Sequence, residues 1–198
     1  MRLHIGSGPV ALEGWTNVDV TAYPGVDVVL DVREPWPFAE VELIFAEHFL
    51  EHLTLAEALA FLRECRRVLR DDGVLRLSTP NLDWVWLTHY KPPAELTIEE
   101  QLIGCLEINR AFHGWGHQFL YNFRTLELAL RAAGFAEVVS REYGISEVEA
   151  LRGLERHERH GDLPDAPSVV VAEARGIALP SGVFEESIAP YMRDYEAR

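Results

Sequence analysis

The sequence contains very little lysine, cysteine or methionine. Lys91 is the only lysine among 18 basic residues, and 32 acidic residues bring the net charge to −14. A chain this acidic is repelled by the phosphate backbone of a nucleic acid unless it carries a local basic patch. The one arginine-rich run, residues 63–70, has its arginines on the polar side of an amphipathic helical pattern. We therefore expect a solvated helix face there and no nucleic-acid partner.

Long apolar runs are also absent. No stretch approaches the length that spans a membrane, and the first residues lack the apolar core of a secretion signal. Cys65 and Cys105 fall in helical patterns without C-x-x-C spacing, which indicates reduced thiols. These features predict a cytoplasmic, acidic protein without a membrane partner. The 198 residues suffice for a single domain with a sizeable core.

Short β-rich runs alternate with amphipathic helical patterns along the chain. We expect strands at residues 3–5, 16–20, 26–30, 41–46, 74–78, 136–142 and 168–174. The middle runs are nearly continuously apolar, as in strands that are covered on both faces. This alternation predicts an α/β fold with a mostly parallel sheet.

Capping signals locate the helices. Thr54 and Glu57 form a capping box that opens a helix, and Gly73 is expected to close it. A second capping box in residues 97–100 predicts a helix to about residue 111. Further helices are expected at residues 83–90, 125–133 and 146–160, followed by a tail over 187–198.

Several polar or glycine residues follow the predicted strands directly. Gly6 and Gly8 come after the first strand, Asp19 ends the second and Asp31 ends the third. In parallel α/β sheets, ligands bind beyond the carboxyl ends of the strands. Each residue alone fits a structural turn or a strand terminator equally well, but their shared register indicates a site along this edge.

Residues 48–52 read H-x-x-E-H, a pattern found in one class of zinc peptidases. In those enzymes the motif lies inside a long helix. Here it follows an apolar strand, and the capped helix begins only at Thr54. We therefore expect a loop or a single turn at the end of a strand, and no peptidase.

The runs "LHIGSG", "GWTNVDV", "DVVLDVREPWPF", "VELIFAEHFLEHL" and "RVLRDDGVLRLSTPN" together resemble class I S-adenosylmethionine-dependent methyltransferases. The later "NRAFHGWGHQFLYNFRTLELALRAAGF" is similar to a bacterial subgroup of predicted methyltransferases without an assigned substrate. The resemblance implies a transferase of class EC 2.1.1 and a Rossmann-like, seven-stranded-type sheet. It implies one domain over residues 1–198, with a cofactor half at about 1–80 and an acceptor half at about 81–198.

The resemblance also implies roles for individual residues in binding S-adenosylmethionine. The cofactor-binding candidates are Gly6, Ser7 and Gly8 for the amino-acid part, Asp19 for the ribose, Asp31 and the Val32 backbone for the adenine, and Glu47 near the transferred methyl group. The pattern departs from the family at one point. Only five residues separate Gly8 from Gly14, too few for a normal helix, so we expect a shortened first crossover that is a loop.

The segment 113–121 carries two histidines, His113 and His117, among aromatic residues. One interpretation is a pocket for a small-molecule acceptor, and the other is an aromatic core loop whose histidines bond backbone carbonyls. The catalytic candidates are His48, His117 and Tyr121, as a base or orienting group for a hydroxyl. O-methylation is therefore our first expectation, with N-methylation close behind.

A metal-dependent reaction is an alternative hypothesis. Glu51, His52 and His117 resemble the metal-binding pattern of small-RNA terminal 2′-O-methyltransferases, with His48 in place of a glutamate. Such ligands suit zinc, iron or manganese better than magnesium. The plain alternative is that Glu51 and His52 bond neighbouring loops and that no metal binds. A third hypothesis, favoured by the short first crossover, is a non-catalytic methyltransferase-like scaffold.

Overall fold

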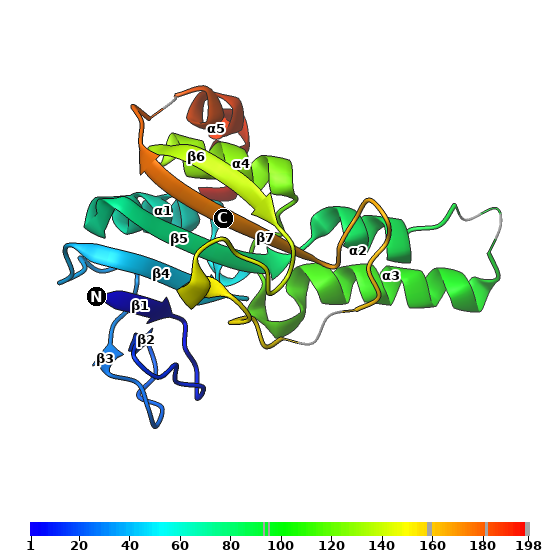
Figure 1. Ribbon diagram of the computed structural model, residues 1–198. Helices are drawn as coiled ribbons and strands as arrows, with labels where there is room; N and C mark the ends of the chain where they lie inside the picture. Colours follow the sequence, from blue (N-terminus) through cyan, green and yellow to red (C-terminus); the bar gives the residue numbers. More distant parts are fainter. Residues whose placement is uncertain (93, 95, 158–159, 181, 197–198) are drawn as a thin grey trace.

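A computed structural model describes residues 1–92, 94, 96–157, 160–180 and 182–196 of the chain. Its centre is a seven-stranded sheet of order β3-β2-β1-β4-β5-β7-β6 (Figure 1). The strands are β1 (Arg2–Ile5), β2 (Thr16–Asp19), β3 (Val28–Val29), β4 (Val41–Glu47), β5 (Leu69–Pro80), β6 (Phe135–Arg141) and β7 (Val169–Ile177). The first five strands pair in parallel, and β7 is antiparallel to both β5 and β6. The expected Rossmann-like, mostly parallel sheet is thus confirmed.

Five α-helices accompany the sheet in the described residues: α1 (Leu55–Val68), α2 (Leu82–His89), α3 (Ile98–His113), α4 (Phe123–Ala132) and α5 (Val183–Glu196). Both capping boxes form as expected. The Glu57 amide donates to Thr54 Oγ1 at 3.3 Å, and the Glu100 amide donates to Thr97 Oγ1 at 3.2 Å. Within the described part of the chain, no helix is both long and apolar enough to cross a membrane.

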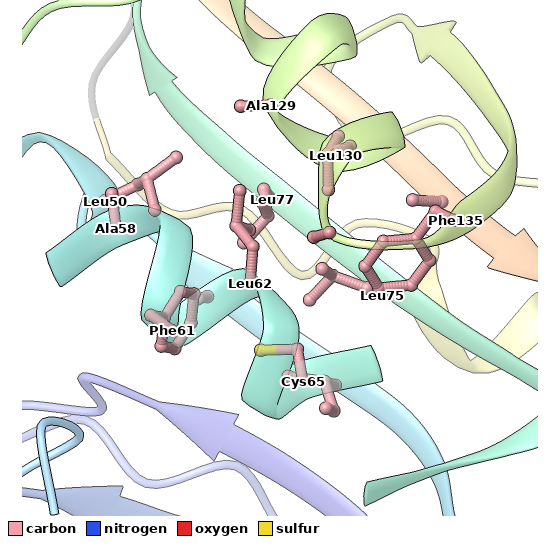
Figure 2. Close-up of a cluster of buried hydrophobic side chains, with 14 of the residues drawn as sticks. Leu50, Ala58, Phe61, Leu62, Cys65, Leu75, Leu77, Ala129, Leu130 and Phe135 are labelled. Atoms are coloured by element: carbon pink, nitrogen blue, oxygen red, sulfur yellow. The ribbon is translucent and has the colours of Figure 1, made fainter. Parts of the chain in front are cut away.

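One face of the sheet carries the main hydrophobic core. Alternate residues of β1, β4, β5 and β7 point to this face, where α1 and α4 cover them. Figure 2 shows Leu62 and Cys65 of α1 beside Leu75 and Leu77 of β5, with Leu130 of α4 close by. These side chains are essentially inaccessible to water. This packing fixes the position of β4 and β5, whose carboxyl ends border the site described below.

The opposite face is built differently, because residues 1–49, all of them described, contain strands, turns and loops but no helix. The expected loop between β1 and β2 is confirmed, and the next two crossovers are loops as well. A row of paired residues crosses this face from His4 through Phe45 and Arg76 to Glu173. This face of the sheet is therefore partly polar, which was not apparent from the sequence.

Arg76 is the centre of a buried ion-pair network on this face. Its guanidinium, fully shielded from water, donates to Glu173 at 2.7 Å and to Glu155. It also donates to the Ile145 carbonyl at 2.9 Å. Because Glu155 and Ile145 belong to the segment 142–157, this network fastens that segment over the sheet face that lacks helices.

The prediction of a helix at residues 146–160 is wrong. Only Glu149–Leu151 forms a single 3₁₀ turn, and residues 158–159 lie outside the described residues. Gly144 and Gly153 both have positive φ, and the Gly153 amide donates to the Gly144 carbonyl at 3.0 Å, which folds the segment back on itself. The buried pairing of Glu155 with Arg76 therefore prevails over the polar helical pattern.

Two smaller expectations also need correction. The helix after Thr54 ends at Val68, and Gly73 lies inside β5, where an added Cβ would come within 3.0 Å of the Val41 carbonyl oxygen. Glycine is needed at this position because two strands approach each other closely, and not because a helix ends there. The expected tail forms α5 as far as Glu196, while residues 197–198 lie outside the described range.

We predict that Arg76→Met lowers the free energy of unfolding by about 3–5 kcal/mol, because it leaves the buried Glu155 carboxylate without its cation, while Glu173 keeps its pairing with Arg141. Urea denaturation measures this change. Arg175→Met is the matched control: Arg175 pairs with Glu137 on the same sheet, but both side chains are nearly half exposed. Its loss is expected to cost less than about 1 kcal/mol. Equal effects of the two substitutions would contradict this account of the network.

Candidate active site

The strand register gathers the candidate cofactor residues at one edge of the sheet. Ile5 of β1 pairs with Val18 of β2 and with Ala46 of β4. The residues that follow these three are Gly6, Asp19 and Glu47, so all three leave the sheet at the same level. Asp31 follows β3, the next strand along this edge. The arrangement is the carboxyl edge at which parallel sheets bind ligands.

The turn after β1 requires glycine. Gly6 and Gly8 have φ values of 66° and 54°, which side-chain-bearing residues adopt only with strain. A Cβ on Gly6 would also overlap the Phe49 ring. The Gly8 amide donates to Asp19 Oδ2 at 2.9 Å, which ties the turn to the end of β2. Ser7 between them is buried, and its amide donates to the Val18 carbonyl at 3.1 Å.

The two aspartates differ in their surroundings. Asp19 accepts hydrogen bonds from the backbone amides of Gly8 and Thr21, one on each carboxylate oxygen, and no side chain neutralises it in the described residues. Asp31 is instead ion-paired with Arg33 at 2.6 Å. Hydrogen bonds from that guanidinium lower the pKa of Asp31 to about 2. The Asp31 carboxylate is therefore anionic at neutral pH, and the Asp19 carboxyl oxygens keep lone pairs for a ligand.

Glu47, at the end of β4, anchors the segment that crosses the sheet. Its Oε1 accepts the backbone amides of Arg156 at 2.7 Å and His157 at 3.0 Å, and its Oε2 lies 3.4 Å from His157 Nδ1. The side chain is buried. This anchoring was not apparent from the sequence, because the two partners lie more than one hundred residues apart.

His48 follows Glu47 in a strained conformation, with φ at 45°. Its Nδ1 lies 3.3 Å from Oε1 of Glu51, and its ring stacks on His157 with the centroids 4.3 Å apart. Burial raises the pKa of Glu51, but its hydrogen bonds and the His48 and His52 imidazoles together lower it below the usual value, so the carboxylate stays ionised. His48 Nε2 is shielded from water and has no hydrogen-bond partner in the described residues.

A cavity of about 650 Å³ opens beside His48. Its walls are His48, Glu51, His52, Pro80, Trp84, Val85, His89, Glu107, Arg110, Ala111, Trp115, His117, His157, His160, Ser168 and Val169. Six of the eight histidines in the chain therefore face one space. The volume fits a drug-sized molecule.

Several residues of this cavity were not expected from the sequence. His157 and His160 fall in the pattern that predicted a helix over 146–160, and both are exposed, yet His157 stacks on His48 and His160 stacks on Trp84 at 5.3 Å. Gly153, which interrupts the expected helix, was the available signal. Arg110, in the last turn of α3, lies over the Trp115 ring at 4.8 Å.

Tyr121 is not placed as a base for an acceptor. Its side chain is fully buried and is not part of the cavity wall. Burial, together with the nearby charge of Glu51, raises the pKa of its phenol. Both observations make Tyr121 a poor base for removing a proton from an acceptor. His113 is exposed and also lies outside the cavity wall, whereas His117 is part of it.

Glu51, His52 and His117 form a compact cluster. One potential metal-binding atom from each residue lies within 4.8 Å of the others. The Glu51 carbonyl accepts the Gln118 amide at 2.7 Å, which holds the loop after α3 against residue 51. His117 Nδ1 lies 2.8 Å from the Ala111 carbonyl oxygen, so Nδ1 is the protonated nitrogen and Nε2 is free to bind. His48, part of the set expected from the sequence, does not join these three.

The H-x-x-E-H motif lies where the sequence analysis expected it. His48 follows β4 directly, and Leu50–His52 forms one 3₁₀ turn before α1. A zinc-peptidase helix is therefore excluded.

Residues 14–77 match the family model of a methyltransferase domain. Over 61 residues the chain is 43% identical to a "Probable S-adenosylmethionine-dependent methyltransferase" of Mycobacterium tuberculosis, known from two strains. The match covers 30% of this chain and 22% of the relative, so it spans about a fifth of the relative's length.

Solved methyltransferase structures share the fold. The CMeT domain of the citrinin polyketide synthase superimposes with a TM-score of 0.54 at 15% identity, over 90% of this chain and 46% of that one. A DhpI–SAH complex gives a TM-score of 0.54 at 14% identity, over 90% and 77% of the two chains. The matched segment and the shared fold agree with the resemblance to class I S-adenosylmethionine-dependent methyltransferases. The cofactor of this class is S-adenosylmethionine.

We predict that Gly6→Ala destabilises the protein more than Gly14→Ala does. Both glycines have positive φ, so alanine costs about 1–2 kcal/mol at either position. Only at Gly6 does the new Cβ overlap a neighbour, whereas nothing lies within 4 Å at Gly14. Overpacking against Phe49 adds about 1–3 kcal/mol. Thermal or urea unfolding measures the difference, and indistinguishable midpoints would show that the turn is looser than described.

Proposed function

We propose that this chain transfers the methyl group of S-adenosylmethionine to a small-molecule acceptor, by preference to a hydroxyl oxygen. The observation that supports this proposal most directly is the position of His48, which follows β4 beside the proposed cofactor edge and also lines the acceptor-sized cavity. The methyl donor and its acceptor can therefore meet at one residue. A cytoplasmic setting, expected from the sequence, is part of the proposal.

In this proposal the cofactor lies along the edge from Gly6 to Asp31. The turn at Gly6, Ser7 and Gly8 presents its backbone to the amino-acid part of S-adenosylmethionine. Asp19, whose oxygens retain lone pairs, accepts the ribose hydroxyls. Asp31 and the Val32 backbone border the adenine. Glu47 supports the positive sulfonium from the end of β4.

His48 is the proposed base. Glu51 lies against the Nδ1 side of its ring, so Nε2, which no described residue bonds, is the nitrogen that would take a proton from an acceptor hydroxyl. Because Nε2 is shielded from water, the acceptor must first displace the stacked His157 ring. The buried carboxylate also stabilises the imidazolium that then forms, as in other carboxylate–histidine pairs. Alignment of the hydroxyl with the methyl group contributes the rest of the rate. The neighbouring histidine His117 orients the acceptor within the cavity.

Calorimetric titration with S-adenosylmethionine and S-adenosylhomocysteine separates this enzyme from a non-catalytic scaffold. We predict that Asp19→Asn weakens binding of both ligands by about 10- to 150-fold, because charge-assisted hydrogen bonds to the ribose are lost.

Asp27→Asn is the matched control for this titration. Asp27 also accepts a backbone amide, that of Asn17 at 2.8 Å, but it lies before β3 and away from the cofactor edge. It is expected to leave both affinities unchanged. The proposal fails if the wild-type protein binds neither ligand at millimolar concentration.

Metal-assisted transfer is a second candidate, favoured by the cluster of Glu51, His52 and His117. Two imidazoles and one carboxylate are the ligand set of several catalytic zinc sites, with a position left open for substrate. The Ala111 carbonyl would fix the tautomer of His117 as outer partners do in such sites. A bound cation would supply Lewis-acid polarisation of an acceptor oxygen.

We predict that the chelator-treated protein takes up one equivalent of Zn²⁺ or Co²⁺, measured by elemental analysis after dialysis. His117→Ala, which removes one of three ligands, is expected to weaken this uptake at least about 100-fold. His113→Ala, an exposed histidine in the last turn of α3, serves as the control. Substoichiometric metal in the wild type, or equal uptake by both variants, rules out the metal-assisted route and leaves His48 as the base.

A further inference from the structure

Helix α3 has no buried residue along its 16 positions. A helix of this length in a globular protein normally gains its stability by burying one apolar face. Figure 1 shows α2 and α3 side by side, extending from the edge of the molecule. The contacts of α3 with the rest of the chain therefore do not supply a buried face.

The two sides of α3 differ in what they contact. Gly104, Glu107 and Ala111 share one face: Gly104 approaches the His89 carbonyl closely, and the other two line the acceptor cavity. The opposite face carries Ile98, Leu102, Cys105 and Leu106 at helical spacing. Ile98, Leu102 and Leu106 are 88%, 58% and 59% exposed. The outer face is thus an apolar stripe that nothing in the described residues covers.

The ends of α3 carry opposite charges. The exposed Glu99 lies in its first turn and the exposed basic residue His113 lies in its last turn, whereas Glu100 is engaged in the capping box and Arg110 lies over Trp115. When two such helices pack antiparallel, the acidic turn of each faces the basic turn of the other, and the helix dipoles also align favourably. A parallel arrangement would instead place like charges together. A second copy of the same helix is therefore complementary to this stripe in both polarity and charge.

We propose that two copies of this chain associate through α3, packed antiparallel about a two-fold axis at the middle of the helix. A two-fold interface uses the same patch on both partners, as this self-complementary helix allows. Trp86, Leu87 and Tyr90 of α2 are also 46–60% exposed.

This association also acts on the acceptor cavity, although the proposal does not depend on the methyl transfer proposed above. Glu107, Arg110 and Ala111 of α3 line the cavity, so pairing of the outer face would hold this wall in place. The net charge of −14 per chain opposes association, but charges more than about 8 Å apart are largely screened at physiological salt.

The chain contains its own reporter for this geometry. Cys105 lies at the middle of α3, so the proposed axis brings the two copies of Cys105 together. The other cysteine, Cys65, is fully buried, and burial raises the pKa of its thiol well above the usual value. A short bis-maleimide linker therefore reports on Cys105 alone.

The test combines sedimentation velocity with this cross-linking on the full chain at 5–100 μM, roughly the range in which standard interfaces are occupied. We expect a dimer that cross-links in the wild type and does not cross-link in Cys105→Ser. Leu102→Glu and Leu106→Glu, each with an unchanged circular dichroism spectrum, are expected to weaken the dimer at least about 100-fold. Leu179 is an apolar residue outside α3 and is 94% exposed, so Leu179→Glu is expected to leave the dimer intact.

Four results would overturn the proposal. The first is a wild-type monomer at 100 μM, roughly the upper end of useful affinity. The second is a dimer that persists in both glutamate variants, which would place the interface elsewhere. The third is a dimer whose Cys105 residues do not cross-link. Binding of a monomer to phosphatidylcholine vesicles would assign the stripe to a lipid surface, and would equally contradict pairing of two copies.

Discussion

The buried guanidinium of Arg76 is the interaction on which the rest of this structure depends. The first three crossovers contain no helices, so one face of the sheet needs another cover. Arg76 provides it by pairing with Glu155 and by bonding the Ile145 carbonyl, which draws the segment 142–157 across the strands. The end of that segment brings His157 onto His48 and completes one wall of the cavity. A structural ion pair therefore determines the shape of the candidate site.

The sheet and its carboxyl edge were predictable from the sequence for local reasons. Apolar runs between turn residues specify strands, and the carboxyl ends of parallel strands meet at one edge whatever covers the faces. That is why Gly6, Asp19, Asp31 and Glu47 emerge together as expected. The capping box at Thr54 was equally predictable, because all its hydrogen bonds lie within four residues.

The acceptor side was less predictable because it depends on contacts between distant residues. The polar pattern at 146–160 fits a solvated helix until the pairing of Glu155 with Arg76, 79 positions away, is known. Tyr121 reads as an accessible base in an aromatic run, yet tertiary packing buries it completely. His117, in contrast, was expected near Glu51 and His52 and does lie there, because the loop after α3 is held by the Glu51 carbonyl.

The central claim is that a methyl donor on the carboxyl edge meets an acceptor cavity at His48. A crystal structure of the full chain with S-adenosylhomocysteine tests this most directly. The account predicts the ribose on the Asp19 carboxylate, the adenine beside Asp31 and Val32, and the sulfur facing His48 at the mouth of the cavity. Ligand bound elsewhere, or with its sulfur directed away from His48, would contradict the account.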